Sequence, residues 1–350
     1  MQTEIAAHVL NKCSSNGSLL NKEEIIEVLS WQDEALLERL FQIADDIRKN
    51  QCGDDVHLRA LIEFSNHCSR NCLYCGIRRG NKKLERYRMT PDEIVDTAVK
   101  ACSAGFKTIV LQSGEDTWFA ADKVSWIVKA IKDRAGCAIT LCIGERTLAE
   151  YEVMKKAGAD RYLIKYETAN PDLYHALHPE MDYENRINIL LWLKEMGYQV
   201  GGGNMVGLPG QTLEDLADDI ILARKLNLDM MGIGPFIPHS ETPLHDFPGG
   251  DLKMVLKTVA VSRIVTLNSH IPATTATGTI DAEGRQKALR CGANVIMPNL
   301  TPAKYRKLYE IYPGKKCSDE EPGRCAGCIK TMVKSMGRNI APDYGHSLKN

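Results

Sequence analysis

Three cysteines close together in the chain, Cys68, Cys72 and Cys75, are the residues best placed to carry out chemistry. They follow the spacing C-x3-C-x2-C, and Tyr74 stands just before the last of them. Three thiolates on one short loop can bind three irons of a cubane iron–sulfur cluster. The fourth iron then stays open to a small molecule, and an open position separates a catalytic metal site from a closed structural one. The alternative is a structural zinc site, although zinc usually takes four ligands and this loop offers three.

Composition limits the classes of protein to which the chain could belong. It has 350 residues, a formal net charge of -1 and 44% hydrophobic residues, enough for one large domain or two ordinary ones. A net charge near zero does not indicate a protein that binds nucleic acid or an anionic membrane surface. Residues 1–12 lack the pattern of a secretory signal, and the apolar run 187–193 is too short to span a bilayer. Because 12 cysteines in a reducing compartment favour metal binding over disulfides, we expect a soluble cytoplasmic metalloprotein.

Short β-rich runs alternate with longer amphipathic runs from residue 55 onward. The expected strands are 56–64, 107–112, 138–143, 161–166, 199–204, 230–235, 272–275 and 294–297. The expected helices are 90–103, 122–134, 147–156, 183–196, 212–226, 253–266 and 281–289. This α/β alternation favours a (β/α)8 TIM barrel. A doubly wound open sheet is the rival, but no G-x-G-x-x-G fingerprint follows the first strand.

The barrel is expected to span residues 55–300. Residues 1–54 form a helical N-terminal extension, with helices near 22–29 and 33–49, and residues 301–350 form a short helix and a cysteine-bearing C-terminal tail. In a barrel, chemistry gathers at the C-terminal ends of the strands. The cysteine loop follows the first expected strand, and polar residues follow the others.

The cysteine spacing, with an aromatic residue before the last cysteine, resembles the signature of the radical SAM superfamily. The resemblance implies a 4Fe–4S cluster whose open iron binds S-adenosyl-L-methionine (SAM) through its amino and carboxylate groups. An electron from the reduced cluster breaks a carbon–sulfur bond of the sulfonium homolytically and yields a 5'-deoxyadenosyl radical. Because that radical attacks nearby hydrogen donors, the barrel must enclose a dry, shaped cavity.

The same resemblance implies contacts to SAM. Residues 113–115 are similar to the turn and acid that face the methionine amino group, and residues 203–208 to the segment along the adenine. Glu167 is expected at the ribose or amino end, and Arg186 at the carboxylate, for which a guanidinium is a suitable partner. The expected cofactor-binding residues are Tyr74, Gln112, Ser113, Gly114, Glu115, Glu167, Arg186, Met205 and Met297. Structural ion pairs are the alternative for the acids and Arg186, and core packing is the alternative for Met205.

A second cysteine set, Cys317, Cys325 and Cys328, gives the spacing C-x7-C-x2-C near the C-terminus. These thiols suit a second cluster, of the 2Fe–2S type. A zinc knuckle with a fourth ligand and unmetallated thiols are the alternatives. We expect a surface site in each case.

Longer stretches resemble one family of this superfamily, the HydE maturases of FeFe-hydrogenases. They are 59–66 (RALIEFSN), 107–116 (KTIVLQSGED), 167–171 (ETANP), 205–211 (MVGLPGQ), 232–239 (GIGPFIPH), 271–276 (IPATTA) and 291–299 (CGANVIMPN). The similarity runs from about residue 20 to the end. The resemblance implies that the protein acts under anaerobic conditions in assembling the dinuclear iron subcluster of the hydrogenase active site, the H-cluster.

The family resemblance also implies a substrate and partners. The substrate would be a small organometallic species, a cysteine-bound iron carrying carbon monoxide and cyanide, held by Arg59, Thr274, Thr275 and Tyr312. Strand alternation points Arg59 inward, where an anionic ligand would offset the cost of burying its charge. The alternatives are an internal acid paired with Arg59, threonines bonded only to backbone, and Tyr312 packed as a lid. The expected protein partners are the maturases HydF and HydG and a flavodoxin- or ferredoxin-type reductant.

Two other functions stay open. A methylornithine-synthase-like or biotin-synthase-like radical SAM enzyme would share the cluster loop but carry other residues at the seventh and eighth strands. A non-catalytic iron–sulfur carrier or scaffold would need no cofactor cavity. The cysteines of the tail favour a maturase over the first, and the polar strand ends argue against the second.

Overall fold

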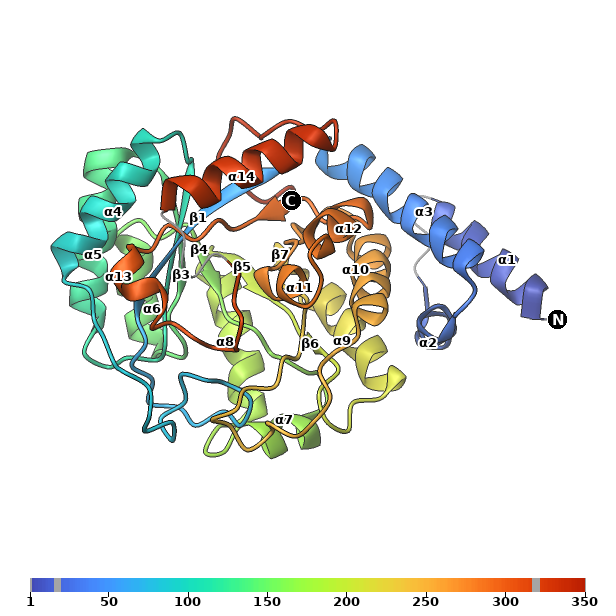
Figure 1. Ribbon diagram of the computed structural model, residues 1–350, viewed down its shortest axis with the longest axis horizontal. Coiled ribbons are helices and arrows are strands. Elements are labelled where there is room, and N and C mark those ends of the chain that lie inside the picture. The colour runs from blue at the N-terminus through green and yellow to red at the C-terminus, as the bar shows by residue number, and fades with distance from the viewer. Residues whose placement is uncertain (1, 16–19, 317–321, 350) are drawn as a thin grey trace.

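Seven short parallel strands form one curled sheet at the centre of the protein (Figure 1). The computed structural model describes residues 2–15, 20–316 and 322–349. The sheet has the order β7-β5-β4-β3-β2-β1-β9. Its strands are β1 (His57–Ser65), β2 (Thr108–Ser113), β3 (Ala138–Cys142), β4 (Arg161–Leu163), β5 (Gln199–Gly202), β7 (Met230–Met231) and β9 (Val295–Ile296). A second pair, β6 (Met205–Val206) and β8 (Gly234–Pro235), continues β5 and β7 beyond the sheet.

The segment 270–273 closes the ring between the edge strands β7 and β9. Parallel bridges join Met230 to His270 and Pro272 to Val295. The N–H of Ala273 donates to the carbonyl of Val295 at 2.8 Å. The order of the strands confirms the barrel that was predicted from the sequence.

The predicted strand at 272–275 is wrong in its second half. The Thr274 hydroxyl accepts the N–H of Thr277 and caps α11 (Thr275–Ile280), so the chain turns into a helix there. Pro272 has no N–H to donate to a strand ladder. The expected strands at 199–204 and 230–235 are each interrupted by one or two residues.

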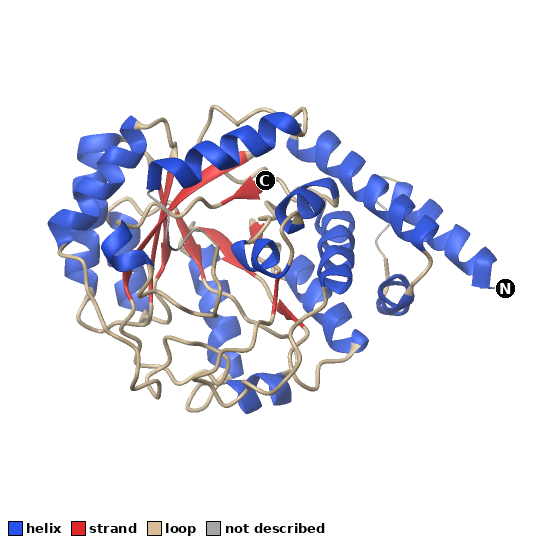
Figure 2. Cartoon of the chain, in the orientation of Figure 1, coloured by secondary structure: helices blue, strands red, loops and turns tan. Residues whose placement is uncertain are grey.

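Helices surround the sheet (Figure 2). They are α4 (Pro91–Ser103), α5 (Ala121–Ala135), α6 (Leu148–Lys156), α7 (Pro171–Leu177), α8 (Tyr183–Glu195), α9 (Leu213–Lys225), α10 (Leu252–Thr266) and α12 (Gly284–Arg290). Thr90 and Glu93 start α4 with the reciprocal hydrogen bonds of a capping box, as its sequence predicts.

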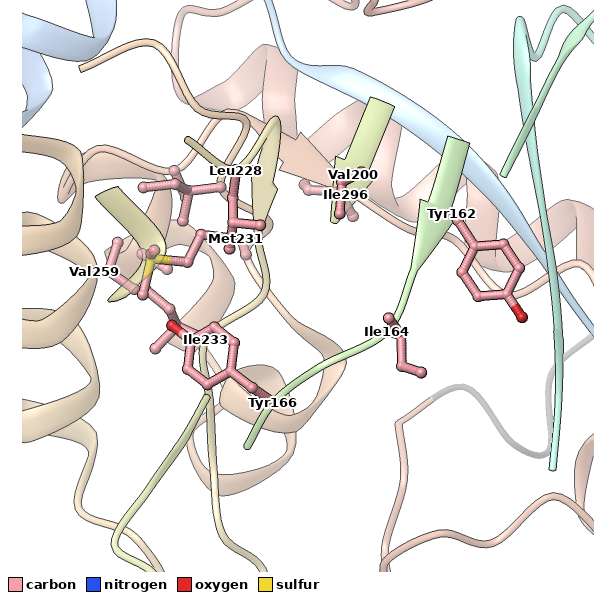
Figure 3. Packing of buried hydrophobic residues seen from close by; sticks show 14 of the residues in the cluster. Tyr162, Ile164, Tyr166, Val200, Leu228, Met231, Ile233, Val259 and Ile296 are labelled. Carbon is pink, nitrogen blue, oxygen red and sulfur yellow. The ribbon is translucent and has the colours of Figure 1, made fainter. Parts of the chain in front are cut away.

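Apolar side chains fill the space between the sheet and the helices. Figure 3 shows Tyr162, Val200 and Met231 from three strands, together with Val259 from α10. All four are fully buried or nearly so. Burying a side chain of this size contributes roughly 1.5–3 kcal/mol, so the contact between barrel and helices holds the strand ends in place.

Three N-terminal helices lie to one side of the barrel: α1 (Gln2–Ser14), α2 (Lys22–Ser30) and α3 (Glu34–Cys52) (Figure 1). The buried ammonium of Lys257, on α10, donates to the carbonyls of Leu29 and Trp31 at the end of α2. A cation placed on the last carbonyls of a helix stabilises its C-terminus. The helices expected near 22–29 and 33–49 are confirmed, whereas α1 was not predicted.

The C-terminal residues cover the end of the barrel at which the strands begin. After α13 (Ala303–Arg306) and α14 (Pro322–Ser335), Ile340 bridges Val56 next to β1. The carbonyls of Tyr344 and Gly345 accept from Nη2 of Arg161 at 2.7 and 3.0 Å. No pattern in the C-terminal residues had indicated this closure. Of the helices in the three described ranges, none has the length and apolar character needed to cross a membrane.

Candidate functional site

The cysteine loop leaves β1 at the C-terminal mouth of the barrel, and polar contacts from one asparagine and one arginine fix its path. Asn66 Nδ2 donates to the carbonyls of Glu85 and Leu308 at 2.8 and 2.7 Å. The Arg86 guanidinium donates to the carbonyls of Ile77 and Arg78 at 2.8 and 2.7 Å. The loop is therefore held by groups well outside the cysteine motif, which the sequence analysis did not single out.

The three thiols lie in surroundings that disfavour free thiolates. Burial raises the pKa of Cys68, and burial and the charge of Cys68 raise that of Cys72 to about 12. Burial and the charges of Cys72 and Cys68 raise the pKa of Cys75 further. Thiolates become stable here only when a positive group joins them, because metal binding displaces the thiol protons. The backbone N–H of Glu115 already points at Cys68 Sγ, 3.4 Å away, as a donor to a ligating sulfur would. These residues fit a 4Fe–4S cluster.

The zinc alternative needs ligands that meet at one ion. Among residues 2–15, 20–316 and 322–349, no three His, Cys, Asp or Glu side chains converge in that way. In a cubane each thiolate binds a different iron.

Two glycines bring the loop after β2 against the cysteine loop. A Cβ on Gly114 would lie 2.3 Å from the His67 carbonyl and 2.8 Å from Cys68 Cβ. Gly144 has φ +79°, and a Cβ there would lie 2.6 Å from a carboxylate oxygen of Glu115. Both positions therefore require glycine, and together they make the room in which Glu115 sits.

The other two expected residues of β2 are placed differently. The Ser113 hydroxyl donates to the Gly114 carbonyl at 2.6 Å and supports the turn. Gln112 Nε2 donates to the Tyr309 hydroxyl at 3.3 Å, which is itself fully buried, so Gln112 faces the inside of the barrel.

A network of ion pairs crosses the mouth. Arg70 Nε lies 2.5 Å from Glu115 Oε1, and its Nη2 lies 3.2 Å from Glu145 Oε2. Arg186 Nε, from α8, donates to Glu145 Oε1 at 2.9 Å. Burial raises the pKa of Glu115. Glu115 and Arg186 therefore share one network, in which each already has a protein partner, as in the structural alternative. Arg70 and Glu145 were missed because no spacing marks them.

Glu167 stands in an unusual backbone conformation four residues after the end of β4. Its φ is +67°, in the left-handed region that disfavours side chains, and such a residue costs on the order of 1–3 kcal/mol. The N–H of Glu167 donates to Gly203 at 3.0 Å and its carbonyl accepts from Met205 at 2.9 Å. Lys165 Nζ lies 2.8 Å from its carboxylate. Strain held in place by neighbours points to a functional role.

A small apolar cluster, separate from the main core, includes two of the expected cofactor residues. Its fully buried members are Leu177, Leu208, Phe236 and Leu244, and Tyr74 and Met205 pack against it. The Tyr74 hydroxyl is 2.8 Å from His178 Nε2. This apolar cluster excludes water beside the cysteine loop. Met297 follows β9 and is half-buried.

Arg59 lies deep inside the barrel, roughly 20 Å along β1 from the cysteine loop at 3.3 Å per residue. Its Nη1 contacts Met230 Sδ at 3.1 Å, across the ring, and its Nη2 donates to the Gly345 carbonyl at 3.0 Å. Arg59, Thr140 and Arg161 line a cavity of about 10 Å³. Arg59 Nε and the Thr140 hydroxyl are both buried there without a hydrogen-bond partner among the described residues. Burial and the charge of Arg161 lower the pKa of Arg59. A small anion bound beside Arg59 would stabilise its charged form.

The remaining expected substrate residues form a separate group around Arg285. Its Nη2 donates to the Thr275 hydroxyl at 3.1 Å, and its charge acts on Tyr312. Thr274 caps α11 and pairs with Thr277 at 2.8 Å. The structure thus places Thr275 and Tyr312 near Arg285, uses Thr274 as a helix cap, and places Arg59 with the C-terminal residues instead.

The tail cysteines are described in part. Cys317 lies outside the described residues. Cys325 and Cys328 are three residues apart on α14, and Cys328 is exposed. This placement agrees with a surface site at Cys328.

Comparisons with known proteins bear on the same residues. Residues 62–223, which include the cysteine loop, match the Radical SAM superfamily. The chain is 54% identical to the [FeFe] hydrogenase maturase subunit HydE of Thermotoga maritima, over 93% of each chain. It is 28% identical to 3-methylornithine synthase of Methanosarcina acetivorans, over 93% of this chain and 92% of that one.

Solved structures agree on the fold. The crystal structure of methylornithine synthase (PylB) superimposes with a TM-score of 0.83 at 24% identity, over 96% of this chain and 97% of that one. The crystal structure of HydG, a maturase of the [FeFe]-hydrogenase, superimposes with a TM-score of 0.81 at 21% identity, over 96% of this chain and 76% of that one. At these identities the likeness shows the shared barrel.

Proposed function

Because the chain belongs to the HydE family of the radical SAM superfamily, we propose that it cleaves SAM reductively while the dinuclear subcluster of the FeFe-hydrogenase H-cluster is assembled. The observation that carries the proposal is the loop of three half-buried thiols at the barrel mouth, of which Cys68 accepts the Glu115 N–H. When bound there, a 4Fe–4S cluster supplies one electron and an open iron for the amino and carboxylate groups of SAM.

The residues of the chain would bind SAM and keep water away from it. The Glu115 carboxylate, seated by Gly114 and Gly144, would exchange its contact with Arg70 for one with the methionine amino group. Arg186, which is buried beside Glu145, would donate hydrogen bonds to the SAM carboxylate. The apolar cluster against which Tyr74 and Met205 pack would keep water away from the reacting carbon.

The substrate is proposed to enter the barrel below SAM. A small anionic iron species, bearing cyanide, carbon monoxide and a cysteine, would point one small anionic ligand at Arg59 and Thr140, because the cavity of about 10 Å³ beside them has room for about one water-sized group. Thr274, Thr275 and Tyr312 would contact it nearer the mouth. HydF and HydG are the proposed assembly partners, and a flavodoxin- or ferredoxin-type protein is the proposed reductant.

A spectroscopic experiment tests the proposed cofactor chemistry. Protein reconstituted anaerobically with iron and sulfide and then reduced should give the paramagnetic resonance signal of a cubane. Addition of SAM should change that signal, because SAM ligates the open iron. A cubane signal that ignores SAM would contradict the proposal and favour an iron–sulfur carrier.

A methylornithine-synthase-like activity is the second candidate, since that fold superimposes over nearly the whole chain. Incubation of the reduced protein with lysine and SAM separates the two. Formation of a methylornithine product would favour the second candidate, and maturation of an apo-hydrogenase would favour the first.

Arg59→Leu should abolish hydrogenase maturation while leaving SAM affinity within about twofold. The side chain lies roughly 20 Å from the cysteine loop, so its loss removes the proposed anion partner and spares the mouth. Hydrogenase activity after in vitro maturation and SAM binding by equilibrium dialysis measure the two effects. Arg224→Leu, at a half-buried arginine of α9 that donates to the Leu20 carbonyl at 3.1 Å, is the control matched for the change in charge. Normal maturation by the Arg59 variant would remove Arg59 from the substrate site.

Cys325→Ala/Cys328→Ala protein should keep SAM cleavage and lose iron. We propose that these residues, with Cys317, hold a 2Fe–2S cluster, supported by their spacing on α14. The double variant should therefore contain about two fewer irons per chain. Iron analysis and chromatography of 5'-deoxyadenosine check the result, and complete loss of cleavage would make the tail part of the reaction.

A further inference from the structure

A strongly basic strip follows the cysteine motif directly. Residues 78–88 read RRGNKKLERYR, with six arginines and lysines and Glu85 as the single acid. The whole chain carries a net charge of -1, so this excess is local. The proposed SAM chemistry takes place inside the barrel and makes no use of the outer side of this strip.

Part of the strip holds the loop, and part of it faces solvent. The Arg86 guanidinium donates hydrogen bonds to main-chain carbonyls, and Arg78 donates to the Asn71 carbonyl at 3.4 Å. Neither of these contacts neutralises the charge. Lys82 is exposed, and Lys83 is 79% exposed with Glu241 3.0 Å away. Exposed pairs of this kind are weak and exchange readily with other acids.

A surface pocket of about 280 Å³ connects the strip with the cysteine loop. Arg79, Arg86, Arg88 and Cys68 line it. Glu115 and Asp116 also line it, and Asp116 pairs with Arg88 at 2.7 Å, so Arg79 and Arg86 carry the excess positive charge of the pocket. Cys68 is the one thiol of the motif on this pocket. Because a sulfur ligand is the outermost atom of an iron–sulfur cluster, this wall is the short path from solvent to a cluster on the loop.

We propose that residues 78–88 are the docking surface for the acidic face of a small, low-potential electron-transfer protein, and that its electron enters beside Cys68. The inference rests on the proposed function, which requires one electron for each SAM cleaved. In this step the reduced flavin or iron–sulfur group of the donor protein loses one electron. The oxidised cluster gains it, and no bond is made or broken.

The charge pattern favours a transient protein partner. Basic groups in a patch steer an acidic partner toward its site and speed association, and the effect falls as salt is added. Electron-transfer complexes are small and short-lived, which suits a strip of 11 residues. A nucleic-acid surface would be basic over a wider face, whereas Glu85, Glu180 and Glu241 lie on or beside this strip.

A charge reversal with a matched control tests the docking. Lys82→Glu/Lys83→Glu changes only exposed side chains of the strip. Lys129→Glu/Lys156→Glu makes the same change in charge on α5 and α6, at lysines 72% and 79% exposed. Oxidised flavodoxin, followed by its flavin fluorescence, is titrated with each protein at several sodium chloride concentrations.

At low salt the strip variant should bind flavodoxin about tenfold more weakly than wild type, the equivalent of two surface ion pairs lost. The control variant should bind like wild type. The affinity of the strip variant should also depend less on salt. Equal affinities for the two variants would overturn the proposal, as would a strip that binds an RNA oligonucleotide and leaves flavodoxin unbound.

Activity assays separate this proposal from the proposed function. With dithionite as reductant, the strip variant should form 5'-deoxyadenosine as fast as wild type, and with reduced flavodoxin it should be several-fold slower. Equal slowing with both reductants would overturn the docking role. If wild type cleaves no SAM with dithionite, the proposed function fails, and the binding titration still decides on the surface.

Discussion

Cys72→Ala protein, rebuilt with iron and sulfide under anaerobic conditions, should form no 5'-deoxyadenosine above the background of SAM decay. Cys72 lies between the other two cysteines of the motif, and burial raises its pKa to about 12. Its alanine replacement leaves two thiols on the loop, which can hold at most two irons of a cubane. A rate that depends on an electron from that cluster then falls to zero within the sensitivity of the chromatography.

The control for this experiment is Cys52→Ala. Cys52 is half-buried at the end of α3 and accepts a hydrogen bond from Arg263. The control variant should bind iron and cleave SAM at the wild-type rate. Wild-type turnover by the Cys72 variant would show that the cluster, or the reaction, lies elsewhere in the chain.

The barrel could be predicted because its signals are local and repeated. Strand-like and helix-like runs alternate along the chain, and side chains such as Thr90 and Glu93 mark where a helix begins. The failure at 272–275 has the same physical origin. Ile271 and Ala273 have the apolar character of a strand, whereas Thr274 forms a capping hydrogen bond whose partner is visible only in three dimensions. Capping and β-pairing compete for the same residues, and packing decides between them.

Parts of the candidate site could be predicted because spacing defines them, and parts could not. The spacing of the cysteine motif already has a physical meaning, and Gly114 was predicted from the resemblance of residues 113–115 to a segment of the superfamily. Arg70 and Glu145 are 75 residues apart and meet only in the folded protein. The same holds for Arg59 and Gly345, which are 286 residues apart. Each partner looks like an ordinary surface residue in the sequence, since charged residues are mostly exposed.

The C-terminal residues show how a prediction can hold for one side chain and miss its surroundings. Arg59 points into the barrel, as strand alternation indicates, and within the described part of the chain its hydrogen bonds include no carboxylate. The carbonyl of Gly345 provides partial compensation, with Arg161 bound to the same atom. The C-terminal segment therefore completes the inner end of the cavity, and an anion is proposed to supply the charge that a carbonyl dipole cannot.

Lys315→Met should destabilise the protein by about 3–5 kcal/mol, the cost of breaking a buried ion pair from one side. Lys315 donates to a carboxylate oxygen of Glu63 in the interior, and the other oxygen accepts from Asn299 at 2.7 Å. Glu63 is fully buried and Lys315 is 8% exposed. Removal of the ammonium leaves a charged carboxylate without its counterion in a medium that solvates it poorly. The free energy of unfolding in urea measures the loss.

The double variant Glu63→Gln/Lys315→Met is the decisive comparison. It removes both charges and keeps an amide oxygen for Asn299, so it should recover most of the stability lost in the single variant. Lys315 also donates to the Tyr309 carbonyl at 3.3 Å, so it ties the segment after α13, including Tyr312, across the barrel. The single variant should therefore become sensitive to protease near residue 312 before the barrel unfolds. If the double variant is as unstable as Lys315→Met, the cost comes from lost packing of the lysine stem, and the ion pair is not what fastens this segment.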